Sequence, residues 1–149
     1  MNEITVIVIP SPDDNGNSKE PYIKRIEDLY LSFESLLGDS CFDVVRITQL
    51  THDRWLYAYV DDEGKLKGLR ANNVFNNFCL DVLGFNPSYT LDGDIILAIS
   101  DCDGKNVDLV GTPSAFILDI LLKRLLDCHR KVQGIPLKAS EPEMIFYAF

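Results

Sequence analysis

The sequence is poor in the features that usually point directly to a metal site. It has two histidines, and none of its four cysteines belongs to a C-x-x-C pair. Structural zinc sites use four ligands that come in such local pairs. The candidates His52, His129, Cys41, Cys79, Cys102 and Cys128 do not form that pattern. We therefore expect no metal, and we interpret the cysteines as reduced and mostly buried, as is typical of a cytoplasmic protein.

Long hydrophobic runs are also missing. The longest apolar zone, Phe116–Leu126, is interrupted by Asp119, Lys123 and Arg124. A segment that short and that charged does not span a bilayer. The chain does not open with a basic segment followed by an apolar run, so we expect no signal peptide.

Positive charge is scarce. The 14 lysines and arginines stand against 23 acidic residues, which gives a formal net charge of -9 and a pI of about 4.5. Nonspecific binding to nucleic acids or to anionic membranes depends on cationic side chains near phosphates. The composition therefore argues against both of these functions.

No motif of covalent or acid–base catalysis is present. The chain lacks a Gly-x-Ser-x-Gly elbow, and its two histidines offer few bases for a nucleophile. The turn Asp101-x-Asp103-Gly104 resembles the start of a calcium loop, but the glutamate at the last position of an EF-hand loop is missing. We expect no catalytic residues, no cofactor and no enzymatic activity.

What the sequence does contain predicts an α+β fold in one domain. Its 149 residues, 46% of them hydrophobic, suffice for a sizeable core. Apolar patterning predicts strands over 3–10, 41–48, 54–61, 91–101 and, more briefly, 107–111, and helices over 21–38, 72–84 and 114–131. We expect a mainly antiparallel sheet of five or six strands with about three helices packed on it. Residues 111–149 form a C-terminal extension of this 1–149 domain, in which Met144–Phe149 is either an edge strand or an exposed tail.

Two of these elements carry sharper expectations. The 54–61 segment has Trp55 and Tyr57 on one side and uncharged residues on the other, which predicts a central strand covered on both faces. In the 72–84 helix, Asn72 or Asn73 can cap the N-terminus, whereas Asn76 and Asn77 fall on the side predicted to face water.

Three stretches form a recognisable sequence pattern: FDVVRI at 42–47, LYAYVDDEGKLKGLRANN at 56–73 and LDGDIIL at 91–97. This pattern resembles the domain of unknown function 3846 family, small proteins of bacteria, phages and plasmids, over roughly residues 4–99. Gly38-Asp39 stands where that family has a double glycine, and Leu69–Asn72 lacks its proline. The resemblance implies an α+β fold and a mobile-element origin, and it implies no activity.

These observations favour a non-catalytic interaction or regulatory protein that acts through a protein partner. Its acidic turns would dock a basic surface through Asp61, Asp62, Glu63, Asp92, Asp94, Asp101 and Asp103. The wide apolar face of the 114–131 helix favours contact with a second copy or with another element of the chain. The basic residues Lys123, Arg124, Arg130 and Lys131 of that helix are best interpreted as complementing its dipole.

Two alternatives remain open at this stage. One is a small-ligand or nucleotide-binding protein that uses the Lys65–Asn77 segment, with Trp55, Tyr57, Lys65, Lys67, Arg70, Asn72 and Asn73 around a cleft. The other is an acidic DNA mimic of the antirestriction type, which needs a denser row of acids than a net charge of -9 over 149 residues supplies.

Overall fold

Five strands and three helices make up the described part of the chain. The structure is a computed structural model, and it describes residues 2–38, 41–64, 67–84 and 91–134. In chain order the elements are β1 (Glu3–Ile9), β2 (Tyr22–Glu27), α1 (Tyr30–Leu36), β3 (Phe42–Thr51), β4 (Arg54–Asp61), α2 (Asn73–Asp81), β5 (Ile95–Ser100) and α3 (Phe116–Val132). The predicted α+β class is confirmed: three helices accompany one five-stranded antiparallel sheet.

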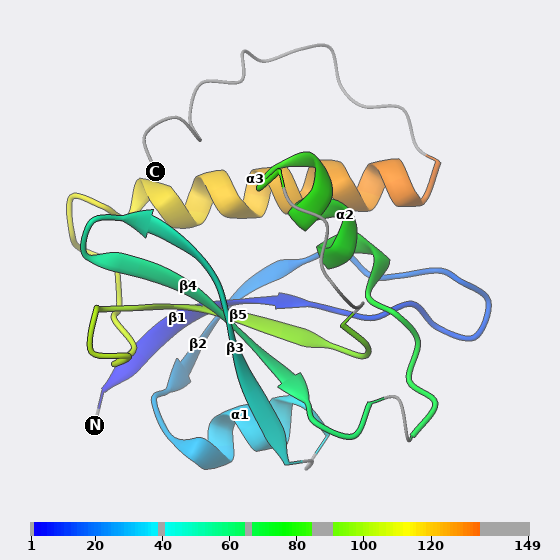
Figure 1. The fold of residues 1–149 in the computed structure, drawn as a ribbon, viewed down its shortest axis with the longest axis horizontal. Coiled ribbons are helices and arrows are strands. Elements are labelled where there is room, and N and C mark those ends of the chain that lie inside the picture. The colour runs from blue at the N-terminus through cyan, green and yellow to red at the C-terminus, as the bar shows by residue number, and fades with distance from the viewer. Residues whose placement is uncertain (1, 39–40, 65–66, 85–90, 135–149) are drawn as a thin grey trace.

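The sheet consists of two hairpins joined by its last strand (Figure 1). Its spatial order is β2-β1-β5-β4-β3, so the β1–β2 hairpin and the β3–β4 hairpin lie on either side of β5. Ile95 of β5 lies between Ile9 of β1 and Val60 of β4. Ile96 lies between Val8 of β1 and Tyr59 of β4. All six residues of β5 are buried, as expected for a strand with neighbours on both edges and cover on both faces.

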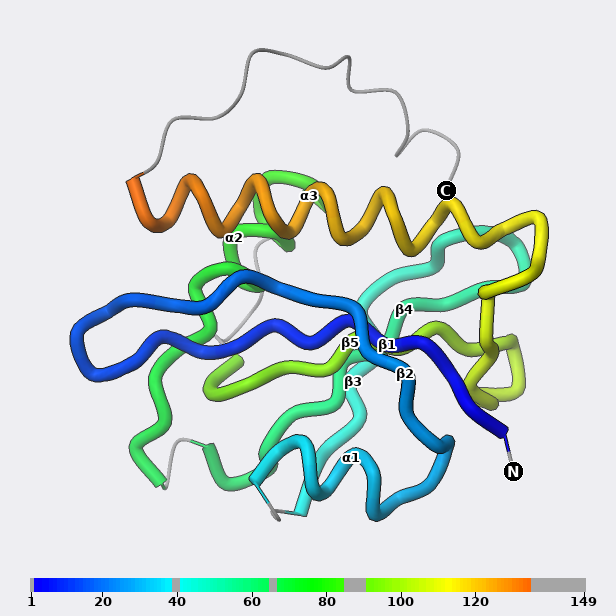
Figure 2. The backbone as a smooth tube through the Cα atoms, turned by 180° about the vertical axis from the view of Figure 1, so that it is seen from behind, coloured from blue at the N-terminus to red at the C-terminus, as the bar shows by residue number. Residues whose placement is uncertain are grey.

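The helices cover both faces of the sheet. Figures 1 and 2 show α1 on one side of it and α2 and α3 on the other. Alternate residues of β4 divide between the two cores: Leu56, Ala58 and Val60 pack toward α2 and α3, whereas Tyr57 and Tyr59 pack toward α1. The prediction of a central, doubly covered strand at 54–61 is therefore confirmed.

The helix predicted over 21–38 is wrong in its first half. Residues Tyr22–Glu27 form β2, and α1 begins only at Tyr30. The isoleucines Ile23 and Ile26 fit a helical spacing, but they also suit a strand in which neighbouring residues alternate between faces. Without β2, the buried strand β1 would leave one row of backbone groups unpaired, and pairing along Glu3–Val8 satisfies them.

The short strand predicted over 107–111 is also wrong. Only an isolated bridge forms between Ser100 and Asn106, and the Val107 backbone N–H donates to the Ile99 carbonyl at 2.8 Å. On that edge of β5, β1 pairs with Ile95–Leu97, so the returning chain meets only the last residues of the strand, through Ile99 and Ser100. The chain therefore leaves the ladder, and Leu109 enters the core beside α3.

The third helix is an integral part of the larger core. Ile117, Leu121 and Leu125 are buried against the sheet. On another side α3 packs against α2, where Lys131 forms an ion pair with Asp81. Contact with the sheet and with α2 accounts for much of the wide apolar face that the sequence predicts for this helix. The segment Met144–Phe149, predicted to be an edge strand or an exposed tail, lies outside the described residues.

The cysteine prediction holds for two of the four residues. Cys79 of α2 and Cys128 of α3 are buried in the same core, and burial raises the pKa of each thiol to about 12. Cys41 and Cys102 are exposed, contrary to the expectation that most would be buried, because both lie in connections at strand ends. None of the four forms a disulfide. Within the described ranges, no helix has the length and apolarity needed to cross a membrane.

Candidate functional site

The acidic turn after β4 is closed by its own side chains. Asp61 is buried, and its carboxylate accepts from the Glu63 backbone N–H at 2.9 Å and from the Lys67 ammonium at 2.9 Å. The hydrogen bond to Asp61 raises the pKa of Lys67, and the charges of Asp61, Glu63 and Asp62 act in the same direction. Asp61 and Lys67 therefore hold the turn together, whereas Asp62 and Glu63 remain exposed.

Asn72, the first residue of the asparagine run, has a structural role, because its side chain connects neighbouring segments. Asn72 is fully buried, and its amide group donates to the carbonyls of Ile9 and Gly93 at 2.9 and 3.0 Å. Its side-chain oxygen accepts from the Phe75 backbone N–H at 3.1 Å. The N-cap prediction is confirmed for Asn72, and Asn73 is exposed.

Asn76 and Asn77 do not face water as the sequence predicted. Both are half-buried, and the Asn76 Oδ1 accepts from the Leu91 backbone N–H at 3.4 Å. The Asn76 Nδ2 and Asn77 Oδ1 atoms are buried without a hydrogen-bond partner in the described part of the chain. The reason is that α2 packs against the sheet, α3 and the segment before β5 together, which leaves it a narrow polar face.

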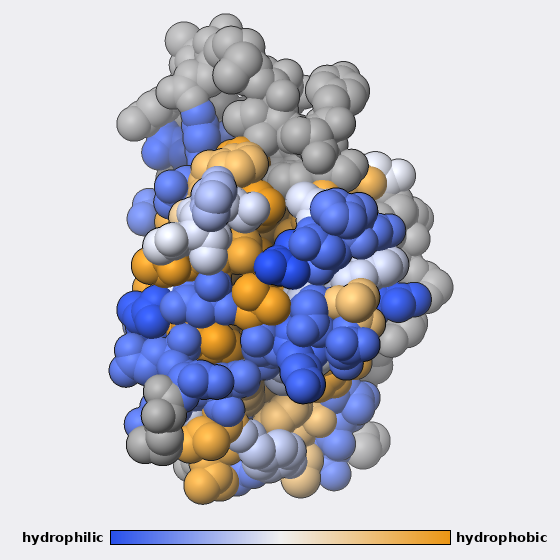
Figure 3. Space-filling view, turned by 90° about the vertical axis from the view of Figure 1, so that its left-hand side faces the viewer, coloured by the Kyte–Doolittle hydropathy of each residue, from blue (hydrophilic) through white to orange (hydrophobic). Residues whose placement is uncertain are grey.

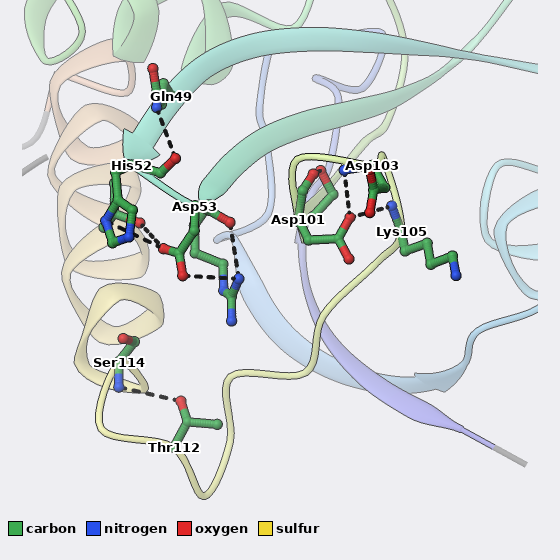
Figure 4. A network of polar contacts seen from close by, with 11 residues as sticks. Gln49, His52, Asp53, Asp101, Asp103, Lys105, Thr112 and Ser114 are labelled. Atoms are coloured by element: carbon green, nitrogen blue, oxygen red, sulfur yellow. Dashed lines mark hydrogen bonds and ion pairs between the residues drawn. The ribbon is translucent and has the colours of Figure 1, made fainter.

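The acidic residues predicted to form one docking surface lie at opposite ends of β5. Asp92 and Asp94 precede this strand, near the turn after β4, and Asp101 and Asp103 follow it. Six residues of strand separate the two groups by about 20 Å. Asp94 accepts from the Ser11 backbone N–H and hydroxyl, and Asp101 accepts from the backbone N–H groups of Asp103 and Lys105 (Figure 4). Asp94 is thus engaged by the segment that follows β1, and Asp101 is engaged by its own turn.

The residues of the ligand-binding alternative are not brought together either. Trp55 lies opposite Ser100, at the end of β4 that is farther from Lys67 and Arg70. Its ring is covered by the Arg46 guanidinium, 4.5 Å from the ring centroid. Tyr57 is half-buried on the α1 side, and Arg70 donates to the Asp14 carbonyl at 2.7 Å. Lys65 lies outside the described residues.

The polar cluster at the β3–β4 turn consists of local contacts (Figure 4). Asp53 accepts from the Thr51 hydroxyl at 2.8 Å, and this bond, together with the charges of Arg54 and His52, lowers the pKa of Asp53. His52 is 3.9 Å from Asp53 and almost fully exposed. Across the described ranges, no three histidine, cysteine or acidic side chains are placed to hold a metal ion. These contacts stabilise a tight turn.

An apolar surface that the sequence reasoning missed lies where α1 meets β3. We define the apolar edge surface as Tyr30, Leu31, Phe42 and Val44. Leu31 is 70% exposed, Tyr30 55% and Val44 48%. The rings of Tyr30 and the half-buried Phe42 are 4.5 Å apart, and Val44 shares the α1-facing side of β3 with Phe42. The surface is therefore continuous from the helix onto the strand.

A rigid base supports this surface. Phe33 of α1 is buried and stacks on Tyr59 of β4, with 3.9 Å between the ring centroids. Phe42 lies beside both rings, 5.9 Å from Phe33 and 5.4 Å from Tyr59. Because α1 has only seven residues, this aromatic cluster is what fixes its position on the sheet. Figure 3 shows hydrophobic groups reaching the surface at the lower end of the molecule, the level at which α1 lies.

Carboxylates border the apolar edge surface. The pKa of the Tyr30 phenol is raised by partial burial, by the Cys41 thiol and by the negative charges of Glu34 and Asp62, so these groups lie near it. The Asp62 backbone N–H donates to the Cys41 carbonyl at 3.3 Å. Asp43, which stands between Phe42 and Val44 in the chain, is exposed on the other face of the sheet, where it lies opposite Val60. The border is acidic, and the centre is apolar.

A local signal for this surface does exist in the sequence. Leu29, Tyr30 and Leu31 are three consecutive apolar residues, and a helix cannot bury three consecutive side chains on one face. The signal is lost when the helix is assumed to start at residue 21.

Comparisons with protein-family models, curated proteins and solved structures found no match for this chain.

Proposed function

We propose that this protein is a non-catalytic interaction module, and that the apolar edge surface is where it binds a protein partner. The observation that carries the proposal is the exposure of Tyr30, Leu31 and Val44 around the contact between the Tyr30 and Phe42 rings, on a rigid base. Single exposed apolar residues are common on soluble proteins, but a continuous group rimmed by polar residues marks an interaction site.

The composition of the surface supports a protein as the partner. Tyr30 and Phe42 offer large apolar area with few rotatable bonds, which suits a binding anchor. Glu34 and Asp62 add negative charge at the border, and Asp43 adds it on the other face of the same strand, which favours a partner with basic groups. The mobile-element origin implied by the family resemblance stays a prediction and adds no activity.

Affinity capture with matched variants tests the proposal. The immobilised protein is exposed to a bacterial lysate, and bound proteins are identified for the wild type and for Leu31→Asp and Val44→Asp. Leu80→Asp and Val110→Asp are the controls, because both leucine and valine there are 52% exposed but lie outside the apolar edge surface. Equal urea midpoints for all variants establish that the fold is retained.

A partner that is lost with Leu31→Asp and Val44→Asp, and kept with both controls, is the expected result. Substituting a carboxylate at the centre of an apolar contact should weaken binding about tenfold or more. Partners retained equally by all four variants would refute the assignment of this surface. Native mass spectrometry of the same samples reports whether the protein itself is a monomer or a dimer.

A further inference from the structure

The two edge strands of the sheet differ in the features of their open sides that hinder pairing with a further strand. The sheet order places β2 and β3 at its edges, and in the described residues neither has a partner on its outer side. β2 carries Lys24, Arg25 and Glu27, all exposed. Charged side chains, lysine above all, are a common device against unwanted strand pairing.

β3 also carries exposed charges, Asp43 and Arg46 among them, but its backbone pairing is irregular only in the second half of the strand. Its pairing with β4 shifts register between Arg46 and Thr48 and again between Gln49 and Thr51. Such bulges twist a strand and interrupt the regular row of edge groups. The first five residues, Phe42–Arg46, pair with β4 in unbroken register from Asp61 to Tyr57. Every second residue of this stretch directs its N–H and C=O groups away from β4.

The stretch in unbroken register also carries exposed apolar groups on its α1 side. Phe42 and Val44 belong to the apolar edge surface, and Tyr30 of α1 stands beside Phe42. A strand added along Phe42–Arg46 would therefore meet two features at once. Its backbone would find open hydrogen-bonding groups, and its side chains on the α1 side would find Val44, Tyr30 and Leu31.

We propose that Phe42–Arg46 is a strand-addition site for an extended peptide segment of a partner protein. The segment carries apolar residues at alternate positions and lysine or arginine between or beside them. The apolar residues pack on the apolar edge surface. The basic residues between them face the side of the sheet that carries Asp43, and those beside them lie near Glu34 and Asp62. This mode of binding draws affinity from main-chain hydrogen bonds and specificity from alternate side chains. The inference deepens the proposed function and rests on it.

A second copy of the chain is a poorer occupant of the same edge. Each copy carries a net charge of -9, and self-pairing along β3 would bring both sets of Asp43, Glu34 and Asp62 together. Like charges at an interface disfavour association. A basic segment relieves this repulsion, whereas a second copy doubles it.

The test uses two capped synthetic peptides, one of alternating lysine and valine and one of alternating glutamate and valine. Binding to the ¹⁵N-labelled protein is followed by amide chemical shifts. We expect the lysine peptide to shift the amides of Phe42–Arg46, and we expect the glutamate peptide to bind about tenfold more weakly or worse. Asp43→Lys and Asp62→Lys should reverse this preference, whereas Asp103→Lys, at the far end of β5, should leave it unchanged.

Backbone methylation of the lysine peptide separates strand addition from other modes. Methyl groups on the amides that point toward β3 remove hydrogen bonds, whereas methyl groups on the other amides do not. We therefore expect one alternate set of N-methylated residues to abolish binding and the other set to preserve it. Equal effects of both sets, or shifts confined to residues outside β3 and α1, would overturn the strand-addition site.

The failures of the two proposals are distinguishable. If the capture experiment finds a partner that depends on Leu31 and Val44, but the methylation pattern is absent, the interaction surface stands and strand addition is refuted. If native mass spectrometry finds a dimer that Val44→Asp dissociates, the occupant is a second copy, and the peptide proposal is refuted. If neither partner nor peptide responds to changes in this surface, both proposals fail.

Discussion

At the scale of single residues, Asn72 links three segments that are distant in the chain. Its side chain bonds to Ile9 at the end of β1, to Gly93 before β5 and to Phe75 in the first turn of α2. An alanine there would remove the helix cap and leave two buried carbonyl groups unpaired. We expect Asn72→Ala to lower the free energy of unfolding by about 3 kcal/mol, measured by urea denaturation.

Asn73→Ala is the matched control for this prediction. Asn73 is the exposed neighbour of Asn72 in the same helical turn, and its replacement should change the free energy of unfolding by about 0.5 kcal/mol or less. Equal stability of the two variants would show that the Asn72 bonds do not stabilise the fold.

A second residue-scale prediction concerns Asp108. Burial alone would raise the pKa of this carboxyl, but hydrogen bonds from Arg25 and from the Val110 backbone, and the charge of Arg25, together lower it below the ordinary value. A carboxyl with a depressed pKa in the folded state stabilises the fold above its unfolded pKa of about 4, and the contribution is lost as the pH falls through the folded pKa.

Asp108→Asn should therefore make stability less sensitive to acid. We expect its urea midpoint to fall less than that of the wild type between pH 7 and the region below about pH 4. Asp103→Asn, which removes an exposed carboxyl of the 101–104 turn, is the control. A wild-type slope in Asp108→Asn would contradict the role assigned to the Arg25 pair.

The asparagines also show what local sequence can predict about single residues. Preference for asparagine at helix N-termini was enough to narrow the cap to Asn72 or Asn73, and the structure assigns it to Asn72. That preference could not reveal that the Asn72 amide group reaches Ile9, 63 residues earlier. For the same reason, helical spacing placed Asn76 and Asn77 on a polar side that α2, packed among several neighbours, does not have.

At the scale of elements, α1 depends on packing rather than on its own stability. A seven-residue helix does not persist alone in water, and Phe33 is its main contact with Tyr59 and the smaller core. We expect Phe33→Ala to release α1 and to lower stability by about 3 kcal/mol. Hydrogen exchange should show that the Leu37 amide, bonded to the Phe33 carbonyl at 3.1 Å, loses most of its protection.

Leu31→Ala is the control for this variant, because it truncates a side chain of α1 that is mostly exposed. It should leave the protection of Leu37 nearly unchanged. If Phe33→Ala and Leu31→Ala had equal effects, the aromatic cluster would not be what fixes α1.

The same segment explains why the elements were only partly predictable. Strands β1, β3, β4 and β5 and helices α2 and α3 follow from strong patterns in their own residues. The Tyr22–Glu27 segment is ambiguous, because two isoleucines three residues apart fit both periods. The segment forms a strand because β1 requires a partner for its backbone groups on that edge. This requirement is visible only once the sheet order is known. For the same reason, the sequence did not predict that α1 begins only at Tyr30, nor that Leu31 is exposed.

At the scale of the whole molecule, the arrangement of strands decides which charged residues meet. Asp92–Asp94 and Asp101–Asp103 are close in sequence, yet the length of β5 separates them. Conversely, the charge of Asp62 acts on the phenol of Tyr30, which comes much earlier in the chain. Sequence predicted an acidic, protein-binding chain without predicting which acids border one surface, because strand order and register set those distances.

The position of β5 also makes a prediction about how the molecule unfolds. It is the strand that both hairpins share, and every one of its side chains is buried. Its amides are therefore expected to exchange only when the whole domain unfolds, with an exchange free energy equal to that from urea denaturation. The α1 amides should exchange at lower free energy, through local opening that leaves the sheet intact. If β5 amides exchanged as readily as those of α1, the two hairpins would be opening independently, and the base that holds β3 in place would not be rigid.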